Sequence, residues 1–327
     1  MKSKNPNFSK NDIIFNNKYI IKKFIDSGGT STVYKCIDNE TGLPRAAKFF
    51  GNIPLNSFER EVNIMKKISE INSPSLMKCY ESGIAFLTQN GESVKKMYCI
   101  LEYGEHGSLF DAVLKTKNGF SEDVTKYIFS QILKGVEDLH KNGICHGDIK
   151  LENILLFGDN YEIKLCDFGF SKIFLDENYK KKKLDEFKGT SQYAAPELFK
   201  GKKYEGDQID IFSLGASLFV LLTKKNAFKK ATKDNNTSEL VNILYSLIKH
   251  KYYQIYWTIL ENNYDVKSLS DNFKKLFLKM VAYNPKERPT IEQIKQDEWL
   301  KDVINATPEQ IMNLKNKMIS EIENQQA

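Results

Sequence analysis

The spacing of apolar residues changes character once along this chain, and that change restricts the folds open to it. Between Lys18 and Tyr103, apolar and polar residues alternate in short runs bounded by turn residues, which is typical of strands. One stretch there, residues 56–70, switches to helical spacing. After Gly107 helical spacing dominates, as in Thr125–Asn142. We therefore predict an α+β protein with a small antiparallel-sheet half that carries one helix and a larger, mainly helical half.

The same pattern divides the chain into four predicted segments. Residues 1–17 are polar and Asn-rich and are expected to form a flexible N-terminal tail. Residues 18–103 form the small half, residues 104–300 the large half, and residues 301–327 an amphipathic helical tail. The junction near Glu102–Gly107 is a natural position for a ligand cleft.

The C-terminal tail carries its own helix signals. Thr307, Pro308 and Gln310 give an N-cap, a first-turn proline and a capping-box partner. The helix could dock on the core, bind a regulatory partner or mediate dimers, and docking is the first expectation. It is neither strongly basic nor aromatic, which argues against calmodulin binding. Its apolar stripe consists of Ile311, Leu314, Met318 and Ile322.

Composition excludes several classes of protein. Of the 327 residues, 41% are hydrophobic and 28% charged, which provides for a large core and argues against disorder. A net charge of +6 is weak evidence for nucleic-acid binding. The longest apolar run, Phe212–Leu222, is interrupted and falls short of the ~18 residues of a membrane span, and no signal-peptide pattern is visible. Five scattered cysteines without CxxC spacing indicate reduced thiols. We expect a protein of the cytoplasm, or of both cytoplasm and nucleus, without nucleic-acid or membrane partners.

A small-residue turn and a lysine form the first candidate site. The run Ile25–Val33 lies between two predicted strands, and Lys48 follows on a third. Small residues let backbone N–H groups approach phosphate oxygens, which a lysine can neutralise. Glu61, on the next helix, can hold that lysine by an ion pair. Taken alone, Gly28-Gly29 is equally an ordinary turn, and Glu61 an ordinary solvated charge.

Two acidic motifs form the second candidate site. The run His146–Asn153 (HGDIKLEN) lies at a helix-to-strand junction, and its Asp148 can orient or accept a hydroxyl proton. Lys150 in the same run can balance phosphoryl charge. Asn153 and Asp167, the latter at the end of a strand, offer the oxygen ligands that Mg²⁺ prefers.

In their joint order these motifs resemble the eukaryotic protein kinase family. The resemblance covers residues 19–300 and implies a two-lobed fold with ATP in the cleft. Within the family, the stretch around 73–83, the pair Tyr256-Trp257 and the run 297–300 are similar to the calcium/calmodulin-dependent and AMP-activated-type kinases. The matching pieces are Ala46-Ala47-Lys48, Glu61, His146–Asn153, Asp167–Gly169, Gly189-Thr190, Ala195–Glu197, Asp210–Gly215 and Arg288-Pro289.

The resemblance implies a catalytic set. Lys48 would contact the α- and β-phosphates of ATP while paired with Glu61. Asp148 would accept or orient the proton of the substrate hydroxyl, and Lys150 would stabilise the transferring phosphoryl group. Thr190, together with Lys150, is typical of the serine/threonine kinases and completes the set.

The resemblance also implies a nucleotide and metal site. Asn153 and Asp167 would hold Mg²⁺. Backbone groups of Glu102–Gly104 would bind adenine, with Leu101 as the gate to the back of the pocket. The nucleotide-binding residues would be Ile25, Asp26, Ser27, Gly28, Gly29, Thr30, Ser31, Val33, Ala46, Lys48, Leu101, Glu102, Tyr103, Gly104, Ser108, Glu152, Asn153, Leu155 and Asp167.

Further positions bear on substrate choice and architecture. Phe170 resembles the large residue that the family associates with serine over threonine. Glu152 stands where members that prefer basic substrates read an upstream basic residue, but Ser108 occupies the other, usually acidic, position, so that preference stays open. Glu197 would pair with Arg288, one of only three arginines. Met65, His146 and Phe168 would belong to a hydrophobic spine.

Three departures from the family pattern matter. Asp26 and Ser31 replace the first and third glycines of the loop. Gly147 replaces the arginine that usually meets a phosphate on the activation segment, and Glu186 stands where that phosphate usually sits. We therefore predict a kinase that does not depend on phosphorylation there. The lysine run 180–183 is expected to be a solvated loop, or else to dock an acidic partner.

Two other functions remain open. A pseudokinase scaffold that binds nucleotide without transfer is favoured by Asp26, Ser31 and Gly147. It is opposed by the intact residues Lys48, Glu61, Asp148, Asn153 and Asp167. A small-molecule phosphotransferase is opposed by Gly189-Thr190 and Ala195–Glu197, which resemble a peptide-binding platform.

Overall fold

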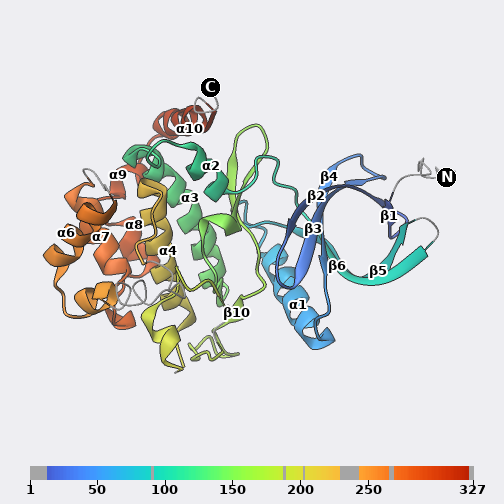
Figure 1. Ribbon diagram of the computed structural model, residues 1–327, viewed down its shortest axis with the longest axis horizontal. Helices are drawn as coiled ribbons and strands as arrows, with labels where there is room; N and C mark the ends of the chain where they lie inside the picture. Colours follow the sequence, from blue (N-terminus) through green and yellow to red (C-terminus); the bar gives the residue numbers. More distant parts are fainter. Residues whose placement is uncertain are drawn as a thin grey trace. The chain divides into compact units, whose positions relative to one another are not determined.

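The computed structural model describes residues 13–89, 92–186, 189–201, 203–228, 243–264 and 269–323 (Figure 1). It consists of two compact units, Met1–Glu105 and His106–Ala327. The first is rich in strands and the second in helices, so the predicted α+β class is confirmed.

The N-terminal unit is an antiparallel barrel. Its strands follow the order β1-β2-β3-β4-β6-β5 and close because β1 pairs with both β2 and β5. Alternation explains much of the core, in which residues two positions apart are buried together: Tyr19 and Ile21, Ala47 and Phe49, and Tyr98 and Ile100. The strands are β1 (Ile13–Phe15), β2 (Tyr19–Ser27), β3 (Ser31–Asp38), β4 (Pro44–Phe50), β5 (Cys79–Gln89) and β6 (Glu92–Leu101).

Strand β1 corrects one sequence-based prediction. The polar segment 1–17 was expected to be a flexible tail, yet residues 13–15 form a strand, and residues 1–12 lie outside the described part. The cause is a short apolar run within the polar segment. Phe15 is fully buried, and its ring meets those of Tyr98 and Phe49 edge-on, with centroids 4.6 and 4.8 Å apart.

One helix accompanies the barrel. Helix α1 (Leu55–Ile71) was predicted over 56–70 and agrees to within one residue at each end. It ends at Asn72, whose φ of 52° is left-handed. Its apolar face is buried, and Phe58 meets Phe50 at the end of β4 with ring centroids 5.1 Å apart.

The C-terminal unit is helical, with two small β pairs. Strand β7 (Ile144–Cys145) pairs with β10 (Lys172–Ile173), and β8 (Ile154–Phe157) with β9 (Glu162–Leu165). Three 3-10 turns, η1 (Leu151–Asn153), η2 (Pro196–Lys200) and η3 (Pro285–Glu287), complete it. The helices are α2 (Leu109–Lys115), α3 (Glu122–Lys141), α4 (Gly206–Thr223), α6 (Tyr253–Tyr264), α7 (Asp271–Met280), α8 (Ile291–Lys295), α9 (Lys301–Ile304) and α10 (Pro308–Glu323).

Helix α4 is the core helix of this unit. By length and composition it could cross a membrane, but 83% of it is buried inside the protein. Burial on all sides explains why its sequence is largely apolar and has no polar face, as for the central helix of a folded domain.

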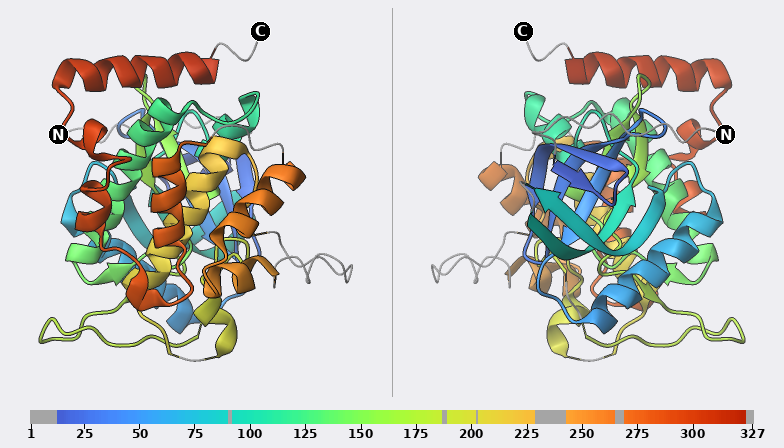
Figure 2. Two further views of the ribbon diagram at one scale, coloured as in Figure 1. Left: turned by 90° about the vertical axis from the view of Figure 1, so that its left-hand side faces the viewer. Right: turned by 90° about the vertical axis from the view of Figure 1, so that its right-hand side faces the viewer.

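Helix α10 packs along α2 and α3 of the same unit (Figure 2). Met318 and Ile322 are buried, whereas Ile311 and Leu314 are half-buried. At its C-terminal end, the Glu321 carboxylate accepts hydrogen bonds from the backbone N–H and the hydroxyl of Ser121, at 2.9 and 2.5 Å. Of the three predicted alternatives for the tail, the structure shows docking on the core.

Candidate active site

The predicted ion pair between Lys48 and Glu61 is present in the N-terminal unit. The Lys48 Nζ lies 2.8 Å from Glu61 Oε1, and each side chain is largely buried. Strand alternation explains the direction of Lys48, because its neighbours Ala47 and Phe49 point into the barrel. Lys48 therefore lies on the opposite face of β4, where α1 supplies its carboxylate.

The same face of the sheet carries other predicted nucleotide-binding residues. Val33 pairs with Lys48 across β3 and β4, and Ala46 pairs with Leu101 across β4 and β6. Directly paired residues share a face, so these four residues form one surface. Beyond β6, the N–H of Glu102 donates to the carbonyl of Lys78 at 3.0 Å.

The hinge residues that follow are partly exposed. The ring of Tyr103 lies under the ammonium of Lys35, 4.6 Å from its centroid. Glu102, Tyr103 and Gly104 are all half-buried. Partial exposure leaves backbone groups of this segment within reach of a ligand.

The glycine-rich turn between β2 and β3 is open. Residues 22–30 are exposed, and the turn closes with a 2.9 Å hydrogen bond from Gly28 N–H to the Ser31 carbonyl. Asp26 accepts the N–H of Ser27 at 2.8 Å, so it binds its own backbone where the family pattern has glycine. A Cβ added at Gly28 or Gly29 would meet no atom of the described chain within 4 Å. Backbone N–H groups at the tip are therefore accessible.

In the C-terminal unit, Asp148 is the centre of the predicted catalytic set. Its Oδ1 accepts the backbone N–H of Thr190 at 2.7 Å, and its Oδ2 lies 3.0 Å from Lys150 Nζ. The Lys150 ammonium also donates to the Thr190 hydroxyl at 2.8 Å. Asp148 is 4% exposed, so these contacts fix the carboxylate in one orientation. The structure thus brings together three residues that are up to 42 positions apart in sequence.

Asn153 and Asp167 fit the partial ligand set expected for Mg²⁺. The Asn153 amide nitrogen donates to the carbonyl and to the Oδ2 of Asp148, at 2.9 and 3.2 Å, so its oxygen is the atom that can face a cation. The N–H of Cys166 donates to the Asn153 carbonyl at 2.9 Å, which joins the two segments. The described residues contain no group of three or more His, Cys, Asp or Glu side chains suited to a metal. Such a sparse set suits Mg²⁺, which keeps water and phosphate ligands.

The loop that carries Asp148 depends on a buried residue for which we predicted no role. Asp210 of α4, 1% exposed, accepts the backbone N–H groups of His146 and Gly147 at 2.8 and 2.9 Å. It also accepts a 2.8 Å hydrogen bond from His140 Nε2. Two sequence signals pointed to Asp210: it begins the run Asp210–Gly215, which resembles a family motif, and it is an acidic residue on a largely apolar helix. Neither signal identified its partners, which lie more than 60 positions away.

The His146 side chain stabilises the loop through hydrogen bonds to backbone groups. Its Nδ1 accepts the N–H of Asp148 at 3.2 Å, so its Nε2 carries the hydrogen that is donated to the Cys166 carbonyl at 2.9 Å. Its ring lies 5.5 Å from that of Phe168, and both residues are buried. Met65, the third predicted spine residue, is buried in the N-terminal unit.

Ser108 has a clear structural role. It is the N-cap of α2, its hydroxyl donates to Asp111 Oδ2 at 2.6 Å, and the Asp111 N–H returns a 3.1 Å hydrogen bond. This capping box is visible in the sequence as Ser-x-x-Asp. Leu155, at the start of β8, forms a backbone bridge with Ser108.

Glu152 lies next to the segment around Thr190. It is exposed, and the hydroxyl of Tyr193 donates to its carboxylate at 3.5 Å. Burial, followed by the charge of Glu152, raises the pKa of the Tyr193 phenol. The phenol therefore stays neutral and remains a hydrogen-bond donor.

The predicted pair between Glu197 and Arg288 is confirmed. Two parallel hydrogen bonds of 2.6 and 2.7 Å join the guanidinium to the carboxylate. The arginine also donates to the carbonyls of Ala282 and Gln208, both at 2.9 Å, and its side chain is fully buried. A lysine could not reproduce this planar arrangement.

The segment after Asp167 is attached to the C-terminal unit by several contacts. The backbones of Leu184 and Tyr204 exchange two 2.8 Å hydrogen bonds. Lys181 forms an ion pair with Asp207, and the Lys182 N–H donates to the Phe174 carbonyl at 2.8 Å. The lysine run is thus part of an ordered hairpin, which projects from this unit in Figure 2.

At position 186, the backbone carbonyl of Glu186 makes the contact to the rest of the unit. The Lys172 ammonium donates to the carbonyl oxygens of Asp185 and Glu186.

Gly147, where the family pattern has arginine, has a φ of 80°, and an added Cβ would lie 2.6 Å from the Phe170 carbonyl oxygen. The backbone there requires glycine.

Comparison with known proteins agrees with this geometry. The family model "Protein kinase domain" matches residues 19–300. A human SNF-related serine/threonine-protein kinase is 31% identical over 244 residues, which cover 75% of this chain and 28% of the human protein. A probable serine/threonine-protein kinase of Dictyostelium discoideum is 31% identical over 306 residues, which cover 90% of this chain and 32% of that protein. The chain thus spans about a third of the length of these relatives.

Proposed function

Because this chain belongs to the protein kinase family, we propose that it transfers the γ-phosphoryl group of Mg·ATP to serine and threonine hydroxyls of proteins. The arrangement around Asp148 carries the proposal. Its carboxylate is oriented by Lys150 and by the backbone of Thr190, and it lies beside an asparagine suited to magnesium. The two relatives named above are serine/threonine kinases by name, which supports the same substrate class.

The proposed chemistry assigns each side chain one task. Asp148 would accept the proton of the substrate hydroxyl as the new O–P bond forms. Lys150, 3.0 Å from that carboxylate, would balance charge on the transferring group. Lys48, fixed by Glu61, would hold the α- and β-phosphates. When bound by Asn153 and Asp167, Mg²⁺ would neutralise charge between the phosphates.

A pseudokinase is the second candidate. Asp26, Ser31 and Gly147 depart from the family pattern and favour it. The hydrogen-bonded Asp148 opposes it, because a carboxylate that accepts the hydroxyl proton serves transfer and is not needed for nucleotide binding.

Phosphate transfer distinguishes the two candidates. Purified protein is mixed with labelled ATP, Mg²⁺ and a generic basic protein, with Asp148→Asn as the matched control. A kinase labels the acceptor and the control does not. Saturable nucleotide binding without transfer would instead identify a pseudokinase.

We further propose that activity does not require phosphorylation of the activation segment. The contacts of Leu184, Lys181 and Lys172 hold this segment without a phosphate. With Gly147 in place of arginine, this position has no guanidinium that could bind a phosphate. Asp210 instead accepts the Gly147 N–H and so holds the backbone of the catalytic loop.

Phosphatase treatment tests this proposal. Complete dephosphorylation, checked by intact mass, is expected to leave the rate of transfer within about twofold. A fall to background would overturn the proposal while leaving the kinase assignment intact.

Substrate preference rests on Phe170. Its side chain is 38% exposed, so it can contact an acceptor residue. We expect a serine peptide to be phosphorylated faster than its threonine counterpart, and Phe170→Ile to reduce that ratio. An unchanged ratio would show that Phe170 does not set the preference.

The cytoplasmic or nuclear localisation stays a prediction from sequence.

A further inference from the structure

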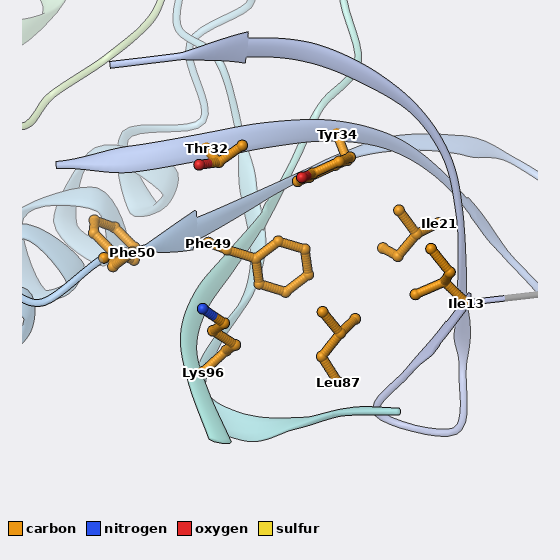
Figure 3. Close-up of a pocket in the computed structure, with 9 residues that line it drawn as sticks. Ile13, Ile21, Thr32, Tyr34, Phe49, Phe50, Leu87 and Lys96 are labelled. Carbon is orange, nitrogen blue, oxygen red and sulfur yellow. The ribbon is translucent and has the colours of Figure 1, made fainter. Parts of the chain in front are cut away.

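The interior of the N-terminal barrel is filled unevenly. At one end, Phe15, Tyr19 and Tyr98 pack together, and both tyrosine hydroxyls donate to the carboxylate of Glu81. Toward the other end lies a cavity of about 230 Å³ (Figure 3). It is bounded by side chains from β1, β2, β3, β4, β5 and β6, chiefly Ile13, Ile21, Tyr34, Phe49, Leu87 and Lys96.

The cavity depends on strand β1. Ile13 of β1 pairs with Ile21 of β2, and Phe15 pairs with Leu87 of β5. Without this strand the space would be an open surface between two sheet edges. The interior of a barrel can hold one small ligand, and a cavity lined mainly by apolar side chains favours a ligand with an apolar body.

One charged group faces this apolar space. Lys96 lines the cavity, and in Figure 3 it extends into the same space as Phe49 and Leu87. It forms no ion pair with any residue that the structure describes. An ammonium beside apolar side chains gains from an anionic partner that brings its own apolar body.

From these observations we propose that the barrel is a binding site for a small monocarboxylate with a compact apolar chain. The carboxylate would pair with Lys96, and the chain would lie against Phe49, Ile21 and Leu87. The size follows from the volume. Since a cavity of about 150 Å³ holds the six carbons of benzene, 230 Å³ holds roughly nine heavy atoms by proportion. Octanoate, with eight carbons and two oxygens, is within one heavy atom of this size and is a suitable probe.

The site is separate from the phosphate-binding face. Phe49 and Lys48 are neighbours on β4 and point to opposite faces, so the carboxylate would occupy the barrel and not the surface that carries Lys48. The proposal therefore does not rest on kinase activity, and binding alone can test it.

Titration calorimetry with the full chain provides the first test. Octanoate is expected to bind saturably, and Lys96→Met is expected to weaken it about tenfold or more, because a charge-assisted hydrogen bond is lost. Lys95→Met is the matched control, since Lys95 is exposed on the other face of the same strand. Octanol should bind both variants alike. Equal losses in the two variants, or no saturable binding at millimolar octanoate, would overturn the proposal.

A second measurement locates the ligand. Methyl NMR should show octanoate shifting signals of Ile13, Ile21 and Leu87 while Ile128, buried in α3 of the other unit, stays unchanged. Leu87→Phe, which fills the space, should abolish binding of octanoate and octanol together while the thermal midpoint shows that the variant is folded. Shifts confined to other methyl groups, or unimpaired binding to a folded Leu87→Phe variant, would contradict the assignment.

Discussion

The glycine-rich turn of the N-terminal unit and the catalytic loop of the C-terminal unit are built in opposite ways. The turn comprises residues 26–31, of which 26–30 are exposed, and its hydrogen bonds from the N–H groups of Ser27 and Gly28 lie within the turn itself. The catalytic loop, residues 146–153, is held from outside by Asp210, Thr190 and Cys166. A loop that grips phosphate through backbone N–H groups can change its side chains, as Asp26 and Ser31 illustrate. A loop that orients a carboxylate cannot change its side chains in this way, because several hydrogen bonds together set the position of that carboxylate.

The largest effect should come from the centre of the catalytic loop. Asp148→Asn keeps the shape of the side chain but removes the proton acceptor. We expect kcat of phosphate transfer to fall by about 10²–10⁴-fold, with nucleotide affinity unchanged in calorimetry. A variant with more than a tenth of the normal rate would show that the carboxylate is dispensable.

Removing the support of the loop should have the next largest effect. Asp210→Asn replaces a carboxylate whose two oxygens each accept a backbone N–H by an amide whose nitrogen cannot accept, so we expect a loss of about 1.5–3 kcal/mol in the free energy of unfolding. Urea denaturation measures the loss, and kcat should fall with it. Stability within 0.5 kcal/mol, a limit of roughly the size of a surface substitution, would deny the support role.

The glycines of the two loops provide a matched comparison. Gly147→Ala should cost about 1–3 kcal/mol in stability, because φ is 80° and the new Cβ would lie 2.6 Å from a carbonyl oxygen. Gly28→Ala should change stability by less than about 0.5 kcal/mol, because nothing of the described chain lies near its Cβ. Thermal denaturation of both variants checks the difference. Equal costs would mean that the two loops are not built differently.

The smallest effect should come from restoring the family glycines. Asp26→Gly and Ser31→Gly together should change KM for ATP by less than about threefold, since the accessible N–H groups are already present. A tenfold fall in KM would show that the altered turn limits nucleotide binding.

The sequence was most informative about features that depend on the kinds of residues present and on their order along the chain. The motifs around Lys48, Asp148 and Asp167 predicted the family, and helical spacing predicted α1. The pair of Glu197 and Arg288 was implied by the family resemblance and supported by the scarcity of arginine in a lysine-rich chain. These inferences rest on local chemistry, which a linear sequence displays.

Long-range contacts explain what the sequence did not predict. Strand β1 has only three residues, too few for a periodic pattern, and its pairing with β5 spans more than seventy positions. Asp210 was part of a recognised motif, but its role depends on donors brought close by folding. The Ser108 hydroxyl caps α2, a role that its spacing to Asp111 indicates, while its part in nucleotide binding stays a prediction.

The central proposal is that this chain binds Mg·ATP and that Lys48 and Asp167 each contribute to the binding. Calorimetry of ATP binding with and without Mg²⁺, on the native chain, Lys48→Met and Asp167→Asn, tests it most directly. We predict saturable, Mg²⁺-dependent binding that each substitution weakens at least tenfold, because one removes a phosphate contact and the other a metal ligand. Failure of the native chain to bind Mg·ATP at millimolar concentration, or binding that neither substitution affects, would contradict the account.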